Sequence, residues 1–358
     1  MKKEIRYCLA FLFALTFLVT DAQDMHFSQF YETSSLINPA ITGVESHLRA
    51  TLQHKEQWRS ITVPFRTFAA SFEMKINRKH SENGSGSRER NKGLFSNLAW
   101  GLSLFSDKAG DANFGLTQAN LSLSSHVPMN ENNSIALGLQ ASIAQRSIDY
   151  SKLIWPDQYT GTGYDQNINP GENVSSSNFI YGDFGAGLLW TYGKGEMYMT
   201  ANDEIKANAG IAVYHINRPR ESLITNNTEV LNLRYVIHGG ASVGIKNTSL
   251  SIAPNFMLNF QGPSQEIVLG LLFKHRLRED SKYTGKIKSA VVSMGGYYRN
   301  RDAIIPAVLI EIERYAVGVS YDLNVSSLRA ASSYRGGIEL MVRFTGATSL
   351  VNKNRPRY

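Results

Sequence analysis

About fourteen short segments in which apolar and polar residues alternate are the feature that most constrains how this chain can fold. In residues 335–344, one face carries Leu340 and Val342. The opposite face carries Glu339 and Arg343. A period of two is typical of β-strands with one apolar side, so the segments predict an all-β fold. The predicted strands are residues 48–54, 67–76, 98–105, 116–127, 134–145, 183–192, 208–215, 234–245, 248–258, 265–274, 289–298, 305–312, 315–323 and 335–344.

The length of these segments indicates a membrane barrel. Most approach the ~9 to 11 residues that a tilted membrane strand needs, and no run beyond residue 22 approaches the ~18 apolar residues of a spanning helix. Charged residues are only 19% of the chain, and tyrosine and phenylalanine number 17 each, which suits aromatic belts. We therefore expect a transmembrane antiparallel β-barrel of about 14 strands over residues 48–344. The alternative is a soluble barrel, in which Tyr315 and Tyr321 would form ordinary cross-strand aromatic contacts.

Residues 1–22 have the composition of a secretory signal peptide. Basic residues precede an apolar run from Leu9 to Val19, and Ala22 supplies a small residue at the expected cleavage point. The only cysteine, Cys8, would leave with this leader. The mature chain would then have no disulfide, no cysteine-ligated zinc and no lipid on an N-terminal cysteine. The whole chain has a net charge of +7, which in a secreted protein is expected to form a solvated or lipopolysaccharide-facing basic surface. We expect no nucleic-acid partner and no cofactor.

Residues 23–47 form an irregular lead-in to the first strand. Its aromatic residues are too apolar to hang free in the periplasm, and an Asn-Pro step followed by glycine allows a sharp reversal of the chain. We predict that this segment is a plug that folds partly into the lumen. The residues that carry this prediction are Phe27, Phe30, Tyr31, Asn38, Pro39 and Gly43.

Several short motifs, in this order and spacing, resemble the PorP/SprF family of the Bacteroidetes type IX secretion system. The resemblance covers nearly the whole mature chain, and the Asn-Pro-Ala step is also similar to FadL-like barrels, in which such a segment sits in the barrel as a hatch. The motifs are FSQF at 27–30, NPA at 38–40 with Gly43, QW at 57–58, PF at 64–65, YR at 298–299, GVSYD at 318–322 and GGIEL at 336–340.

The resemblance implies an outer-membrane component of type IX secretion, in contact with outer-membrane lipid. Its partners would be large secreted adhesins, bound through their C-terminal domains, and other type IX secretion components. The protein would help to secrete these adhesins or retain them at the cell surface, with gliding motility or adhesion as the consequence. The alternative is a FadL-like channel that carries an apolar small molecule across the outer membrane.

The lengths of the connections predict which ends of the strands face the periplasm. The fourth, eighth and twelfth connections (128–133, 246–247 and 313–314) are short, whereas the fifth and seventh (146–182 and 216–233) are long. Bacterial barrels have short periplasmic turns and longer outer loops, so even-numbered connections are predicted to be periplasmic.

Three basic stretches fall on the same predicted side. The connections 77–97 and 275–288 are long, and each carries five lysine or arginine residues, so we expect them to meet an acidic periplasmic partner. Simple solvated loops are an equal alternative. Residues 345–358 are expected to form a basic periplasmic tail.

Charged residues on the polar strand faces are predicted to line the lumen, where each must be paired or hydrated. One hypothesis is a structural network that grips the N-terminal segment and closes the pore. The other is a selective channel whose charges choose a solute. The residues are Asp183, Arg234, His238, Glu266, Glu311, Asp322, Glu339 and Arg343.

The sequence shows no convincing catalytic motif. Residues 240–244 match the G-x-S-x-G spacing of a nucleophile elbow, but they lie within an alternating strand rather than at a strand-to-helix turn. The eight histidines include no H-E-x-x-H pair. We therefore predict that the protein is not an enzyme.

The longest connection, residues 146–182, lies on the predicted outer side. It places Trp155, Tyr159 and Tyr164 among glycine, asparagine and serine residues, a mixture of rigid aromatic anchors and adaptable polar groups that is common on binding surfaces. We predict that these three residues help to bind the exported adhesin. The alternative is a loop that folds inward and caps the pore.

Overall fold

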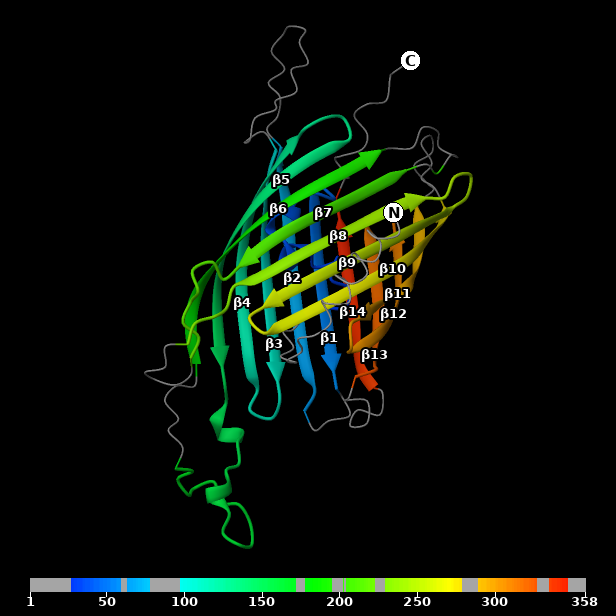
Figure 1. The fold of residues 1–358 in the computed structure, drawn as a ribbon. Coiled ribbons are helices and arrows are strands. Elements are labelled where there is room, and N and C mark those ends of the chain that lie inside the picture. Colours follow the sequence, from blue (N-terminus) through cyan, green and yellow to red (C-terminus); the bar gives the residue numbers. More distant parts are fainter. Residues whose placement is uncertain are drawn as a thin grey trace, which may run out of the picture.

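The computed structural model describes residues 27–58, 63–77, 97–171, 178–194, 202, 204–222, 229–278, 289–326 and 335–346. Within these residues, fourteen antiparallel strands form one closed barrel, in which each strand pairs with its neighbours in sequence and β1 pairs with β14 (Figure 1). The strands are β1 Leu48–Gln57, β2 Phe65–Asn77, β3 Asn97–Ala109, β4 Phe114–Pro128, β5 Asn133–Ser147, β6 Asn178–Lys194, β7 Ile205–Tyr214, β8 Arg234–Gly244, β9 Leu250–Gln261, β10 Ser264–Arg278, β11 Ala290–Arg299, β12 Ala303–Ile312, β13 Tyr315–Asn324 and β14 Arg335–Thr345.

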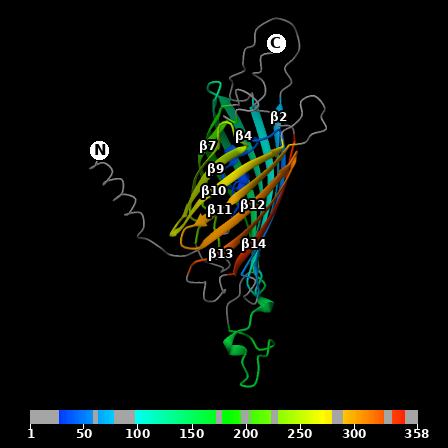
Figure 2. The ribbon, with the colours of Figure 1, turned by 90° about the vertical axis from the view of Figure 1, so that its right-hand side faces the viewer.

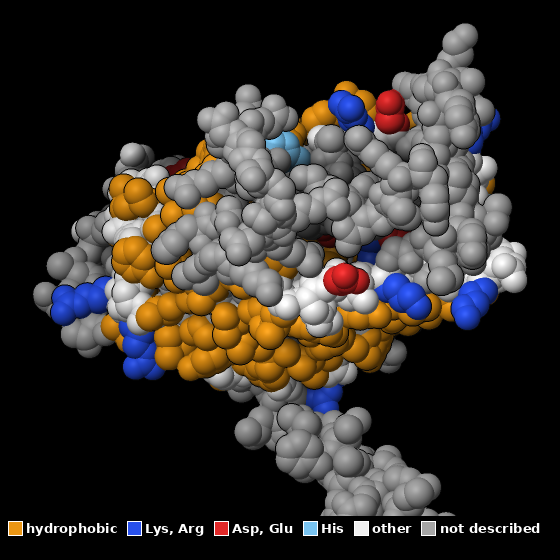
Figure 3. Space-filling view, turned by 90° about the horizontal axis from the view of Figure 1, so that it is seen from above, with side chains coloured by type: hydrophobic (Ala, Val, Ile, Leu, Met, Phe, Trp, Pro, Cys, Tyr) orange, Lys and Arg blue, Asp and Glu red, His pale blue; other side chains and the backbone are white. Residues whose placement is uncertain are grey.

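The alternation in sequence becomes the two sides of the barrel wall, which confirms the predicted fold class. On β4, Leu121 and Leu123 point outward and are about half exposed, whereas Asn120 and Ser122 point inward and are buried. Figure 3 looks onto one end of the barrel and shows apolar side chains covering the visible outer wall. An apolar outer surface is what contact with lipid requires.

The inner wall is not uniformly polar, which the alternating pattern does not predict. From β7 to β12, inward positions carry apolar residues such as Val236, Met257 and Ile305, all buried. They pack against Phe30 and Ile37 of the N-terminal lead-in. A strand can be apolar on both faces here because the segment inside the barrel, rather than water, covers the inner face.

The described part of the lead-in lies within the barrel. It contains a single α-helical turn, α2 (Ser34–Ile37), followed by the 3₁₀ turn η1 (Pro39–Ile41), which lies against β4, β5 and β6. Within the described part of the chain, no helix is long and apolar enough to cross a membrane.

The connection between β5 and β6 is the largest described feature outside the barrel. Its residues up to Gly171 include two 3₁₀ turns, η2 (Tyr150–Lys152) and η3 (Pro156–Gln158), and project away from the barrel end (Figures 1 and 2). This part of the loop therefore does not fold inward over the lumen. The predicted leader, most of the basic connections 77–97 and 275–288, and most of the C-terminal tail lie outside the described residues.

Candidate functional site in the barrel lumen

The N-terminal lead-in runs lengthwise along the inside of β1. Three inward side chains of this strand mark its course. Lys55 Nζ donates to Ser28 Oγ (3.0 Å), Gln53 Nε2 approaches the carbonyl of Gln29 (3.5 Å), and Arg49 Nη2 donates to the carbonyl of Glu32 (3.0 Å). The segment therefore starts near the end of β1 that leads to the odd-numbered connections. It then crosses the lumen to the other end, where β1 begins.

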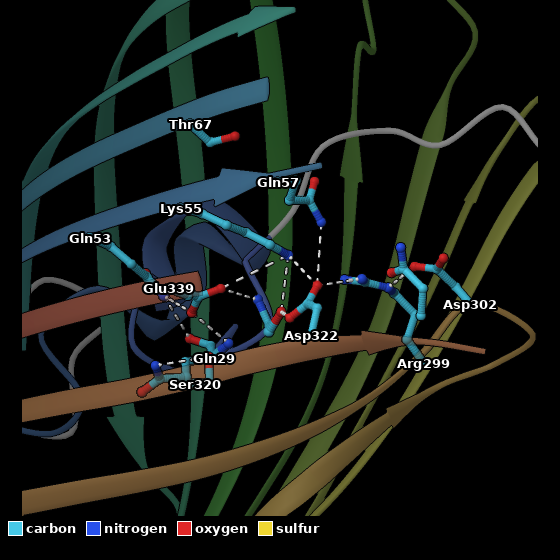
Figure 4. A network of polar contacts seen from close by, with 12 residues as sticks. Gln29, Gln53, Lys55, Gln57, Thr67, Arg299, Asp302, Ser320, Asp322 and Glu339 are labelled. Atoms are coloured by element: carbon cyan, nitrogen blue, oxygen red, sulfur yellow. Dashed lines mark hydrogen bonds and ion pairs between the residues drawn. The ribbon is translucent and has the colours of Figure 1, made fainter. Parts of the chain in front are cut away.

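Five of the motifs that are scattered along the sequence meet in one buried polar cluster (Figure 4). Its centre is Asp322, whose Oδ2 accepts hydrogen bonds from Arg299 Nη2 (2.6 Å) and Gln57 Nε2 (3.3 Å) and pairs with Lys55 Nζ (3.1 Å). Arg299 also pairs with Asp302 (2.5 Å). Because each buried charge has an opposite charge beside it, the cluster avoids the cost of an isolated charge in the lumen, which is several kcal/mol or more.

Glu339 binds the backbone of the lead-in directly. Its two carboxylate oxygens accept hydrogen bonds from the backbone N–H of Ser28 (2.7 Å) and of Gln29 (2.9 Å). Gln53 Nε2 donates to the same carboxylate at 2.6 Å. At Gly318, a Cβ atom would overlap the Gln29 side chain, so glycine leaves the room that this side chain occupies. The start of the described segment is therefore held by charge-assisted hydrogen bonds in a buried place.

The Asn-Pro-Ala step sits on a patch of three inward glycines, which we call the glycine seat: Gly138 on β5, Gly187 on β6 and Gly210 on β7. Gly138 and Gly187 are register partners. A Cβ atom at any of the three positions would collide with Asn38, Pro39 or Ala40. The glycines thus let the segment approach the backbone of the barrel wall, which no larger residue would allow.

Asn38 uses both ends of its amide on this seat. Its Nδ2 donates to the carbonyl of Leu188 (3.0 Å) on β6, lies 3.3 Å from the carbonyl of Ile211 on β7, and lies 3.0 Å from His238 Nε2. Its Oδ1 accepts from the N–H of Ala40 (2.9 Å) and so caps η1. A fully buried asparagine with its amide satisfied fixes the position of the segment against β6 and β7.

The end of the lead-in is fastened to β2 and β4. Gly43 has a φ of 75°, and its N–H donates to Glu73 Oε2 (3.0 Å). The carbonyl of Thr42 accepts from Ser124 Oγ (2.6 Å). Glycine tolerates the left-handed conformation that this reversal requires, and the chain then enters β1.

The aromatic residues of the segment occupy different surroundings. Phe30 is buried in the apolar cluster and packs edge-on against Tyr297 at 5.8 Å between ring centroids. Phe27 contacts Phe105 of β3 at 6.5 Å. Tyr31 is half-buried and approaches Asn208 Oδ1 with its hydroxyl at 3.4 Å. All three rings are therefore inside the barrel.

The eight predicted lumen charges all lie on inward positions, but they belong to separate groups. Glu339 and His238 contact the lead-in as described above, and Asp322 Oδ1 accepts a hydrogen bond from Ser28 Oγ (2.8 Å). Arg343 pairs with both Glu32 of the lead-in and Glu311 of β12.

The remaining three lie along β6, β8 and β10, outside these contacts. Asp183 is buried beside His215, with 3.0 Å between Oδ2 and Nδ1. Arg234 donates to Asn259 Oδ1 (3.0 Å), and Glu266 is partly buried on β10.

Sequence reasoning misses several residues that hold the segment. Lys55 falls outside the first predicted strand, which ends at residue 54, whereas the observed strand continues to Gln57. Arg49 and Glu73 lie on inward positions of the strands predicted at 48–54 and 67–76, so the alternation alone could have identified them. The glycine seat carries no local signal, because its members are brought together only by the register of β5, β6 and β7.

The projecting loop has a folded core of its own. Gln158 is buried, accepts from the N–H of Trp155 (3.1 Å) and donates to the carbonyl of Ile168 (3.1 Å). Tyr159 and Tyr164 form an isolated β-bridge with their rings 5.1 Å apart, and both are more than half exposed. Trp155 is partly buried where η3 begins.

An ordered turn lies at the base of this loop. The Ser151 hydroxyl donates to Asp149 Oδ1 (2.6 Å), and this hydrogen bond, together with nearby Lys152, holds the pKa of the Asp149 carboxyl below its usual value. The loop therefore presents a compact surface with a tyrosine pair at its exposed side.

The pentapeptide Gly240–Gly244 lies inside β8 and not at a turn between a strand and a helix. This backbone does not provide the strained turn that a nucleophile elbow requires. The resemblance in spacing therefore carries no catalytic geometry.

Three solved structures to which the chain is similar are outer-membrane proteins of low sequence identity. The "CymD monoaromatic hydrocarbon channel" has 11% identity and a TM-score of 0.43, covering 88% of this chain and 93% of that one. The P. putida toluene transporter TodX has 9% identity and a TM-score of 0.41, covering 88% and 94%. BamA from Haemophilus ducreyi has 11% identity and a TM-score of 0.39, covering 84% and 70%.

Among curated proteins, no match was found. A family model, described as type IX secretion system membrane protein PorP/SprF, matches residues 19–344. That range includes the FSQF motif whose Ser28 and Gln29 are held in the lumen, the Asn-Pro-Ala step on its glycine seat, and all but the last residue of β14. The chain therefore belongs to the PorP/SprF family of type IX secretion system membrane proteins.

Proposed function

We propose that this protein is an outer-membrane component of type IX secretion that retains an exported adhesin at the cell surface. The observation that carries the proposal is the family membership over residues 19–344. A lumen occupied by the protein's own lead-in supports a role in holding a protein partner rather than in passing solutes. In this proposal, the odd-numbered connections face outward and the even-numbered connections face the periplasm.

The loop between β5 and β6 is the proposed contact with the adhesin's C-terminal domain. Tyr159 and Tyr164 supply two rigid aromatic surfaces, and Ile154 of the same loop is also exposed. Aromatic residues are enriched where protein interfaces derive most of their binding energy. Exposed Asp157 and partly exposed Asp165 lie beside these residues in sequence and favour a partner surface with a basic rim.

The test is the double substitution Tyr159→Ser and Tyr164→Ser. We expect the barrel to remain heat-modifiable and in the outer membrane, because the substituted rings are exposed and pack against each other rather than against the barrel wall. Loss of two aromatic anchors at about 2 kcal/mol each should weaken adhesin binding by roughly 10²- to 10³-fold. The adhesin should then move from the cell fraction to the medium, as measured by quantitative immunoblotting.

The matched control is the double substitution Thr162→Ala and Asn167→Ala, which changes exposed polar residues of the same loop. This control should retain the adhesin on the cells. Full retention by the tyrosine variant would contradict the proposed role of the loop.

A second candidate function is a channel for an apolar small molecule. The apolar inner wall from β7 to β12 favours it, because an apolar solute could replace Phe30 and Ile37 there. A lumen that is open in the purified protein would be its signature.

A further inference from the structure

The barrel closes at a seam where β1 pairs with β14, two strands at opposite ends of the barrel sequence. The other strand pairs join segments that are neighbours in the chain. Bringing such distant segments together has the largest loop-closure cost of any pair in the barrel. We propose that residues 28–34 of the lead-in act as a bracket that keeps this seam closed, by binding both of its strands from inside the lumen.

The first part of the bracket is Glu32. A single carboxylate oxygen, Oε2, accepts hydrogen bonds from Arg49 Nη2 of β1 (3.1 Å) and from Arg343 Nη1 of β14 (2.6 Å). The three side chains are almost entirely buried. The carboxylate thus joins the two seam strands through one atom. Its negative charge also lies between the two guanidinium groups and so reduces their repulsion across the seam, while Glu45 and Glu311 each pair with one of them.

The second part lies further along the seam. The backbone N–H groups of Ser28 and Gln29 donate to Glu339 of β14 (2.7 and 2.9 Å). On the other side, Lys55 Nζ of β1 donates to Ser28 Oγ (3.0 Å). The segment therefore binds one partner from each strand at this level too, in addition to the direct ion pair between Lys55 and Glu339 (4.0 Å).

These two contacts are spaced along most of the paired length of the seam. Lys55 and Glu339 are register partners. Arg343 is paired with Thr51, which lies two residues after Arg49 in β1. Separation of β1 from β14 would break the contacts at both levels together. The bracket therefore adds its stability specifically to closure of the seam, and the final pairing of β1 with β14 depends on a seated lead-in.

The test begins with Glu32→Ala. Its matched control is Glu45→Ala, which removes the other carboxylate bound to Arg49 (2.7 Å). Among the described residues, the hydrogen bonds and ion pairs of Glu45 include none to β14. Glu45 is about half exposed, so its loss should have little effect. Glu32→Ala should lower the unfolding midpoint of the detergent-solubilised barrel by roughly 5 to 15 °C, as read from its heat-modifiable band.

Engineered disulfides then locate the effect. Leu52 and Val342 are outward-facing register partners across the seam, and Ile237 and Leu258 are outward-facing register partners across β8 and β9. Counted from the backbone hydrogen bonds at the ends of the two ladders, both pairs occupy hydrogen-bonded positions of the antiparallel sheet. The two cross-links therefore have matched geometry. Each pair is changed to cysteine in the Glu32→Ala background, and oxidised and reduced samples of the same protein are compared.

If residues 28–34 bracket the seam, oxidation of the pair made by Leu52→Cys and Val342→Cys reverses most of the decrease in the unfolding midpoint caused by Glu32→Ala. Oxidation of the pair made by Ile237→Cys and Leu258→Cys does not. Equal rescue by both cross-links would show general stabilisation and would overturn the proposal. An unchanged midpoint for Glu32→Ala, or no rescue by the seam disulfide, would overturn it as well.

Discussion

Replacement of Gly187 by valine is expected to displace the lead-in from the barrel wall. A Cβ atom at this position would overlap Asn38 Oδ1, and the branched side chain would also meet Pro39. Overpacking costs about 1 to 3 kcal/mol, and the loss of the hydrogen bonds of Asn38 adds about 1 kcal/mol for each bond. The free energy of unfolding in urea should therefore fall by roughly 3 to 5 kcal/mol. Residues 27–46 should also become sensitive to protease.

The control for this prediction lies on the same strand. Gly182 of β6 faces outward, and among the described residues the nearest atom to a Cβ placed there would be the Ser142 carbonyl oxygen, at 4.0 Å. Gly182→Val should leave both stability and protease resistance close to those of the native protein. If Gly187→Val behaved like Gly182→Val, the glycine seat would have no role in holding the segment.

Reversal of the charge at Glu339 is expected to have the second large effect. Glu339→Lys would place an ammonium group beside Lys55 and leave the N–H groups of Ser28 and Gln29 without their acceptor. Breaking a buried ion pair costs about 3 to 5 kcal/mol, and each buried donor left unsatisfied costs about 1 to 3 kcal/mol more. We expect little or no folded barrel to accumulate in the outer membrane, as measured by the heat-modifiable band in membrane fractions.

A milder substitution keeps this prediction measurable. Glu339→Gln removes the charge but retains one amide oxygen as an acceptor, so the barrel should fold with a lower urea midpoint. Arg66→Gln is the control, because it breaks an exposed ion pair with Glu56 (3.4 Å) that is worth less than about 1 kcal/mol. Equal urea midpoints for Glu339→Gln and Arg66→Gln would contradict the role assigned to Glu339.

The fold could be predicted from sequence because a period of two is a local property that each strand displays independently. The apolar inner wall could not be predicted in this way. Residues such as Val236 and Met257 break the alternation of apolar and polar residues, and only their packing in one cluster with Phe30 explains why they are apolar. The predicted strand boundaries are also too short in places. The first predicted strand ends at residue 54 and so leaves out Lys55, a charged residue that contacts both the lead-in and Asp322.

The candidate site shows the same limit more clearly. Motifs containing Ser28, Arg299 and Asp322 are each visible in sequence, yet nothing local indicates that they form one cluster. Their meeting depends on closure of the barrel, which brings β14 beside β1, and on the path of the lead-in through the lumen. Long-range register carries that information, and a single sequence does not display it.

Single-channel conductance in planar lipid bilayers tests most directly whether the lead-in closes this barrel. Barrels of eight strands are filled by their own side chains, whereas those of 16 to 18 strands leave an aqueous channel, so a fourteen-stranded barrel needs an additional segment to close it. The comparison protein carries a Gly-Ser linker of equal length in place of residues 35–43, which removes the Asn-Pro-Ala step but keeps residues 28–34. The native protein should show no steady openings, and the linker variant should conduct. Steady conductance of the native protein at the level of the variant would contradict a closed lumen and favour a transport channel.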